Sequence, residues 1–139
     1  MASTTETPVY TAHVNVTGGR EGHAISDDGR LDLSLARPGA SGAGTNPEQL
    51  FAAGYAACFQ SAMASVARQQ GLDVSSSVIE SSVSLYRGEG AFHLGVAMKV
   101  TVPGLALDQI QALVDAAHQV CPYSNATRGN IAVSFQVAN

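Results

Sequence analysis

Apolar and polar residues alternate along residues 9–16 and 131–137, a pattern typical of strands with one buried face. Strands are also expected over residues 23–26, 31–35, 74–85 and 92–102, which gives six in all. The Asp-Asp-Gly sequence at 27–29 predicts a hairpin turn between the second and third strands. Residues 88–90, which contain two glycines, are expected to join the two longest strands.

A long helix is expected between the third and fourth strands, over residues 47–70. Asn46 is a good N-cap residue, Pro47 suits the first helical position, and Glu48 suits the positive end of the helix dipole. Gly71 is a typical residue to end the helix. Small residues recur at a spacing of four along it, which would let another backbone approach closely. We therefore expect this helix to be buried nearly all round, in a domain core or in a dimer core.

A second helix is expected over residues 107–120, with Ile110, Leu113, Val114 and Ala117 on one face. Pro122 is expected to end it. Strands and helices then follow one another in an order that predicts an α+β fold. We expect one domain over residues 1–139, with residues 1–7 as a loose tail.

The composition narrows the class of protein. Only 13% of the residues are charged, about half the usual fraction, which suggests that part of the surface is covered by a second copy of the chain. The net charge is −4 and the basic residues do not cluster, so nucleic-acid binding is disfavoured. We find no apolar run that we expect to span a bilayer, and no signal peptide, so we expect a cytoplasmic protein without membrane association.

Two cysteines, Cys58 and Cys121, are the candidate reactive groups. A permanent disulfide is not expected in a reducing compartment, so the thiols are either inert core residues or a redox pair. Cys121 falls at the C-terminal end of a helix, where the helix dipole disfavours a thiolate, so it suits a thiol that waits for an activated partner. Cys58 lies within the apolar helix, where burial would disfavour its thiolate unless a cation lies nearby.

Arg20, which follows two glycines, is the best candidate for that cation, because a guanidinium can contact a thiolate and a carboxylate together. Glu48 could hold the guanidinium. In a straight helix Glu48 and Cys58 would lie about 15 Å apart. Arg20 would then bridge them, or the helix would bend near Gly54, or the groups would come from different subunits.

Other chemistries have weaker support in the sequence. His118 and Cys121 have a spacing that could place them on one metal ion, but two further ligands are missing, so we expect no metal site. A hydrolase that pairs Cys58 with a histidine lacks any local signature.

Two long segments resemble the organic hydroperoxide resistance proteins of the OsmC/Ohr family. The first is Thr-Asn-Pro-Glu-Gln-Leu-Phe-Ala-Ala-Gly-Tyr-Ala-Ala-Cys-Phe at 45–59, and the second is Val-Cys-Pro-Tyr-Ser-Asn-Ala-Thr-Arg-Gly-Asn-Ile at 120–131. Gly-Gly-Arg at 18–20 is similar to a third segment of that family.

This resemblance implies an intertwined α+β homodimer, with strands around a long buried helix and active sites at the interface. It implies that Cys58 is the peroxidatic thiol, that Cys121 is the resolving thiol, and that Arg20 and Glu48 form a polar pair around Cys58. It also implies no bound cofactor, and reduction by dihydrolipoamide or a lipoylated protein.

The expected activity is the reduction of organic hydroperoxides. Three aromatic residues are candidates for binding the organic group: Phe51, Tyr55 and Phe59. An OsmC-type peroxidase with a broader peroxide preference, and a non-catalytic binding protein on the same fold, remain as alternatives.

Overall fold

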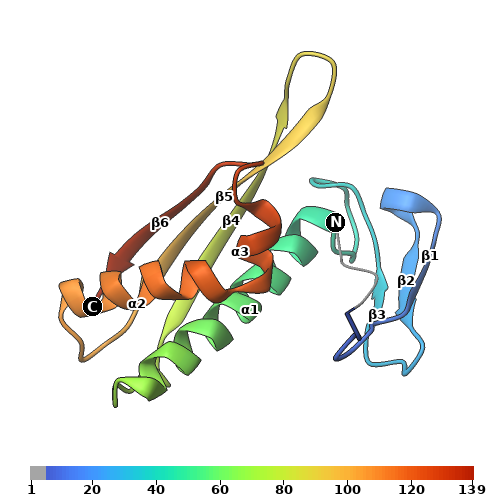
Figure 1. Ribbon diagram of the computed structural model, residues 1–139. Helices are drawn as coiled ribbons and strands as arrows, with labels where there is room; N and C mark the ends of the chain where they lie inside the picture. Colours follow the sequence, from blue (N-terminus) through green and yellow to red (C-terminus); the bar gives the residue numbers. More distant parts are fainter. Residues whose placement is uncertain (1–5) are drawn as a thin grey trace. The chain divides into compact units, whose positions relative to one another are not determined.

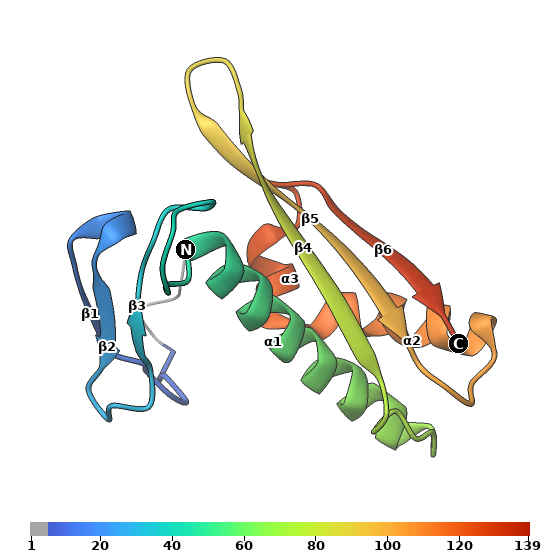
Figure 2. The ribbon, with the colours of Figure 1, turned by 180° about the vertical axis from the view of Figure 1, so that it is seen from behind.

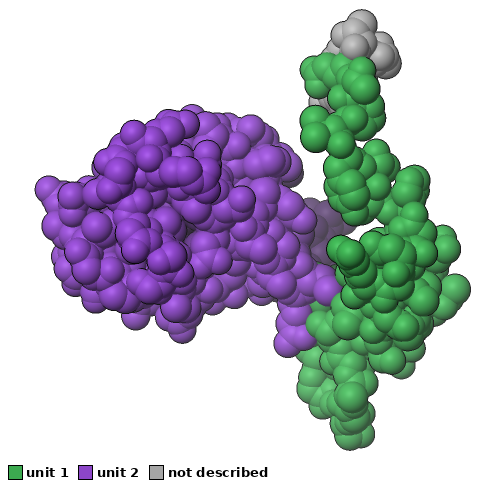
Figure 3. Space-filling view, turned by 90° about the horizontal axis from the view of Figure 1, so that it is seen from below, with its two compact units in different colours: residues 1–47 green, residues 48–139 purple. Residues whose placement is uncertain are grey.

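A computed structural model describes residues 6–139, and the chain divides into two compact units, residues 1–47 and 48–139 (Figure 3). The predicted tail over residues 1–7 lies mostly outside the described residues. The expectation of a single domain stays a prediction.

The first unit contains a three-stranded antiparallel sheet in the order β1-β2-β3. Its strands are β1 (Val14–Thr17), β2 (His23–Ser26) and β3 (Asp32–Ser34). The bounds of β2 are as predicted, whereas the expected start of the first strand at residue 9 is wrong. The register explains the difference, because Val14 already pairs with Ser26, the last residue of β2.

A tight turn around the 3-10 helix η1 (Gly19–Glu21) joins β1 to β2 and carries Arg20. Gly18 and Gly19 both have positive φ angles, 77° and 60°, a conformation that other residues rarely adopt. A Cβ atom on Gly22 would lie 1.6 Å from the Thr17 carbonyl oxygen, so the two ends of the turn pack backbone against backbone. The glycines that flank Arg20 are therefore required by the turn itself.

The second unit contains a three-stranded sheet in the order β4-β5-β6 (Figures 1 and 2). Its strands are β4 (Val78–Arg87), β5 (Phe92–Thr101) and β6 (Val133–Ala138). β4 and β5 form the expected hairpin, and β6 pairs with β5 in parallel. The predicted start of β4 at residue 74 is wrong, because the Asp73 carboxylate accepts a hydrogen bond from Ser75 N–H and begins a turn instead.

Two helices, α1 (Pro47–Gln69) and α2 (Leu107–Val120), supply the core that covers one face of this sheet. Alternate residues of β5, such as Val96, Met98 and Val100, face that core and are buried. The predicted bounds of α2 and its predicted buried face are confirmed. The opposite face of the sheet carries exposed residues such as Lys99. The unit therefore has two layers, with helices on one side of the sheet.

In the single chain α1 is buried along one side only, and its expected burial in a dimer core stays a prediction. One stripe is buried, formed by Tyr55, Phe59, Met63 and Ala67. The small-residue stripe on another face is exposed in the single chain, formed by Ala53, Ala57, Ser61 and Ser65. By length and composition alone α1 would suffice to cross a membrane, contrary to the expectation that no apolar run would. The core helix of a protein outside any membrane meets the same criterion, so this finding assigns no membrane span.

A short third helix, α3 (Pro122–Thr127), follows α2 and was not expected from the sequence. Pro122 ends α2, as predicted, but it also occupies the first turn of α3, where its missing N–H costs nothing. The residue between the two helices is Cys121, which ends one helix and begins the next.

Candidate active site

Cys58 lies in the middle of α1, partly buried, and its sulfur meets two groups from the α2–α3 junction. The backbone N–H of Tyr123 and the Cys121 thiol both lie near enough to this sulfur to act on its pKa. The two cysteines, far apart in the sequence, are therefore neighbours. Both are thiols rather than a disulfide.

The environment raises the pKa of the Cys58 thiol above its ordinary value. Burial is the main cause, and the neighbouring Cys121 thiol acts in the same direction, whereas the Tyr123 N–H lowers the pKa. The causes found within residues 48–139 include no cation.

Cys121 is fully buried and held by backbone hydrogen bonds on both sides. Its N–H donates to the Ala117 carbonyl at 2.8 Å, and its own carbonyl accepts from Asn125 N–H at 3.0 Å. Cys121 lies at the negative end of α2, as predicted from the sequence, but it also lies at the positive end of α3. The following helix turns its N–H groups toward the same region, which is how Tyr123 reaches Cys58.

Arg20 and Glu48 lie in different units of the chain. Arg20 is the central residue of η1, and Glu48 lies in the first turn of α1, more than two turns before Cys58. Their expected roles as a polar pair around Cys58 stay predictions.

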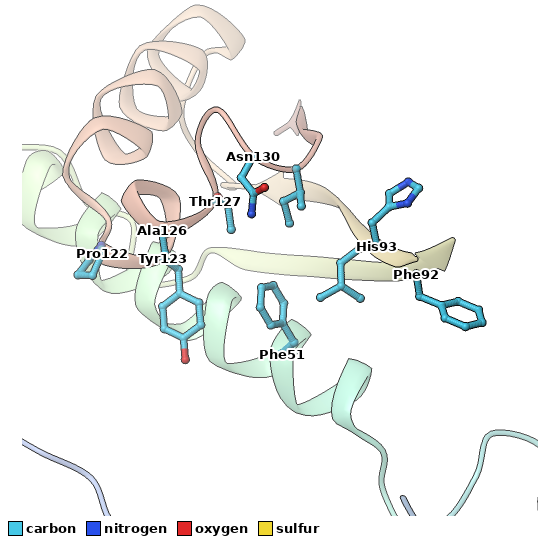
Figure 4. A pocket seen from close by; sticks show the side chains of 10 residues that line it. Phe51, Phe92, His93, Pro122, Tyr123, Ala126, Thr127 and Asn130 are labelled. Carbon is cyan, nitrogen blue, oxygen red and sulfur yellow. The ribbon is translucent and has the colours of Figure 1, made fainter. Parts of the chain in front are cut away.

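The second unit has a pocket of about 710 Å³ that is lined mainly by apolar side chains, and neither cysteine is part of its lining (Figure 4). Its lining comes from α1, the start of β5, α3 and the loop after α3: Phe51, Phe92, His93, Leu94, Pro122, Tyr123, Ala126, Thr127, Asn130 and Ile131. Pro122 and Tyr123 directly follow Cys121, so one short segment supplies the second thiol, the N–H that faces Cys58 and part of the pocket wall.

The three aromatic candidates for substrate binding occupy different environments. Phe51 lines the pocket and lies edge-to-face with Tyr123, with ring centroids 6.1 Å apart. Tyr55 and Phe59 are fully buried and are not part of the pocket lining. Gly54 makes room for Tyr123, because a Cβ atom there would lie 2.7 Å from the Tyr123 hydroxyl oxygen.

A chain of buried hydrogen bonds, not expected from the sequence, joins α1 to α2 and α3. The Tyr55 hydroxyl lies 2.8 Å from Ser124 Oγ and 3.3 Å from Thr127 Oγ1, and Ser124 Oγ lies 2.8 Å from His118 Nδ1. His118 is thus engaged with a serine, and residues 6–139 contain no group of three or more histidine, cysteine or acidic side chains placed to hold a metal. The alternation of apolar residues carries no signal for such a chain, because its members come from distant segments.

Comparisons with known proteins show the family to which the chain belongs. The sequence pattern of the OsmC-like protein family matches residues 39–136. The chain is 54% identical over 138 residues to an organic hydroperoxide resistance protein of Xanthomonas axonopodis pv. citri, covering 96% of this chain and 97% of the relative.

Two solved structures share the fold along nearly the whole chain. The organic hydroperoxide resistance protein OhrB of Bacillus subtilis superposes with a TM-score of 0.88 at 48% identity, covering 94% of this chain and 99% of that one. A corresponding protein from Legionella pneumophila gives a TM-score of 0.89 at 48% identity, covering 96% and 100%. The chain therefore belongs to the OsmC/Ohr family, as one of its organic hydroperoxide resistance proteins.

Proposed function

We propose that the protein reduces organic hydroperoxides to alcohols with Cys58 and Cys121, in a two-thiol peroxidase cycle. The observation that carries this proposal is that the two thiols are neighbours in a unit whose largely apolar pocket is lined in part by Pro122 and Tyr123, the residues that follow Cys121. Membership of the organic hydroperoxide resistance proteins supports the choice of substrate.

The cycle has three steps. The Cys58 thiolate attacks one peroxide oxygen of ROOH, the O–O bond breaks, and the alcohol leaves with a proton while Cys58 becomes a sulfenic acid. The Cys121 thiol then attacks the Cys58 sulfur, which forms a disulfide and releases water. An external dithiol reduces this disulfide by exchange and is itself oxidised. A cytoplasmic location, where thiols are kept reduced, fits this cycle.

Arg20 has a defined role in the proposal. A thiol with a pKa near 8.5 is only about 3% ionised at pH 7, so full ionisation accelerates attack about thirtyfold at most. The burial of Cys58 makes ionisation less favourable still. We propose that the Arg20 guanidinium, held by Glu48, stabilises the thiolate and the charge that develops on the peroxide oxygens.

We also propose that the protein is a homodimer and that a lipoylated protein is its electron donor. The exposed small-residue stripe on α1 supports the dimer, since it offers a surface on which a second backbone could pack closely. Analytical ultracentrifugation would test the dimer. Steady-state turnover with dihydrolipoamide, and separately with thioredoxin, as the only donor would test the reductant.

Intact mass after one equivalent of cumene hydroperoxide tests the thiol cycle. The wild type should lose two hydrogens, whereas Cys121→Ser should gain one oxygen on Cys58 and Cys58→Ser should not react. Arg20→Gln should slow the first step strongly, and Arg30→Gln is the matched control, because Arg30 is highly exposed. An unreactive wild type would refute the peroxidase assignment and favour a non-catalytic binding protein.

The rates with cumene hydroperoxide and hydrogen peroxide distinguish the two kinds of peroxidase. A strong preference for cumene hydroperoxide is expected from the apolar pocket lining. Equal rates would instead indicate an OsmC-type enzyme with a broad peroxide preference.

A further inference from the structure

The hydrogen-bond chain of His118, Ser124 and Tyr55 lies beside both thiols, yet the cycle above does not use it. Tyr55 precedes Cys58 by one turn of α1, and Ser124 directly follows Tyr123 on α3. The Tyr55 hydroxyl and Ser124 Oγ are 2.8 Å apart, and both residues are fully buried. One hydrogen bond thus links the turn that carries Cys58 to the helix that begins at Cys121.

We propose that this His118–Ser124–Tyr55 chain is a positioning device, which fixes α3 on α1 so that the Tyr123 N–H and the Cys121 thiol stay aimed at Cys58. The inference rests on the proposed function and adds three positioning residues to it. None of the three is proposed to touch the peroxide.

Hydrogen bonds can hold the two helices in one alignment in a way that apolar packing does not. Burial of apolar surface is non-directional, whereas a hydrogen bond weakens steeply when its angle or length changes. The Tyr123 N–H must point at one sulfur, and Cys121 must lie within bonding reach of it. A displacement of about 1 Å is enough to impair such an arrangement.

The donors in the chain also fit together. Each hydroxyl supplies one hydrogen, and Thr127 can donate its hydrogen to the Ser124 carbonyl at 3.3 Å. Tyr55 can then donate to Thr127, Ser124 to Tyr55, and His118 Nδ1 to Ser124, so every hydroxyl both donates and accepts. His118 is the end of the chain and its only partly exposed member.

The surroundings of His118 come from three elements. Asp115 of α2 and Arg128 after α3 are the charged groups that act on it. Phe135 of β6 packs edge-to-face on its ring, with centroids 5.1 Å apart. The ring is therefore held by packing as well as by Ser124, which makes it a firm end point for the chain.

The test follows the pH dependence of Cys58 alkylation by iodoacetamide, read for this residue by peptide mass spectrometry. Tyr55→Phe and His118→Leu should shift the profile upward by about 1 pH unit, the effect of one lost hydrogen bond to a thiolate, and slow alkylation at pH 7 about tenfold. His118→Asn, which keeps a polar atom near the position of Nδ1, should restore most of the wild-type profile. Tyr86→Phe is the matched control, because Tyr86 is exposed and stacks on His93 instead.

Profiles of Tyr55→Phe and His118→Leu that coincide with the wild type would overturn the inference. So would a His118→Asn profile equal to that of His118→Leu, because the residue would then act only by packing. If Tyr55→Phe does not fold, the partly exposed His118 site still gives the test. Alkylation needs no peroxide, so a wild type that fails to reduce peroxide would refute the proposed function without changing this result.

Discussion

Replacing Phe51 and Phe59 by alanine, one at a time, separates the pocket from the core. Phe59 is fully buried and its ring stacks on Phe135 with centroids 4.8 Å apart. Its removal should lower the free energy of unfolding by about 3 to 5 kcal/mol, a large part of the ~5–15 kcal/mol that holds a domain together. The pocket is not lined by Phe59, so peroxide selectivity should not change.

Phe51 should behave in the opposite way. It is only partly buried, and its edge-to-face contacts with Tyr55 and Tyr123, at 6.2 Å and 6.1 Å between centroids, contribute about 0.5 to 1.5 kcal/mol each. Its removal should therefore lower the free energy of unfolding by about 1 to 3 kcal/mol. If part of the Phe51 ring contacts the organic group of the substrate, Phe51→Ala should weaken transition-state binding by about 1.4 kcal/mol. This corresponds to a roughly tenfold lower kcat/KM.

Urea unfolding followed by circular dichroism measures the first quantity, and steady-state peroxide consumption measures the second. The kcat/KM for cumene hydroperoxide should fall in Phe51→Ala while that for hydrogen peroxide, which has no organic group, stays close to wild type. The reasoning fails if Phe59→Ala changes the ratio of these two constants as much as Phe51→Ala does. It also fails if Phe51→Ala leaves the ratio unchanged.

Three further substitutions test other parts of the structure. Gly22→Ala would bring Cβ to 1.6 Å from the Thr17 carbonyl oxygen, so the turn must open at a cost of about 3 kcal/mol or more, and hydrogen exchange should increase in β1 and β2. Gly54→Ala should change stability by less than about 1 kcal/mol, because the better helix propensity offsets the contact with the mobile end of Tyr123. The kcat/KM of Gly54→Ala should nevertheless fall severalfold. An unchanged kcat/KM would show that catalysis does not depend on the position of the Tyr123 side chain. Burial lowers the pKa of His118, so the unfolded chain takes up this proton more readily, and stability should decline as the pH falls below about 6.5. Urea unfolding of His118→Asn at pH 7.5 and pH 5 should lack this component, and parallel losses in both proteins would contradict it.

Elements with strong local signals could be predicted from the sequence. α2 has a regular apolar face ending at Val120, and its bounds are those expected. β2 lies between Gly22 and the Asp-Asp-Gly turn, and its bounds are also as expected. The error at β1 arose because an alternating pattern extends over residues 9–16 while its partner strand is only four residues long. Pattern alone does not show how much of a strand finds a partner.

The candidate site was only partly predictable. The sequence singled out both cysteines, and the structure brings them together. The contribution of Tyr123 N–H was missed, because Pro122 is equally suited to ending one helix and beginning another. The link from Tyr55 to Ser124 was missed for a different reason. It joins residues 69 positions apart, and no local pattern reports such a contact.

The parallel pairing of β5 and β6 has a consequence for how the chain matures. Parallel neighbours cannot be joined by a tight turn, so β6 can dock only after α2 and α3 have folded back across the sheet. Contacts between such distant segments form slowly, because the loop must close before they are gained. Cys121 lies within that crossover, so it reaches its final place late. Until then a newly made polypeptide holds Cys58 without its neighbouring thiol.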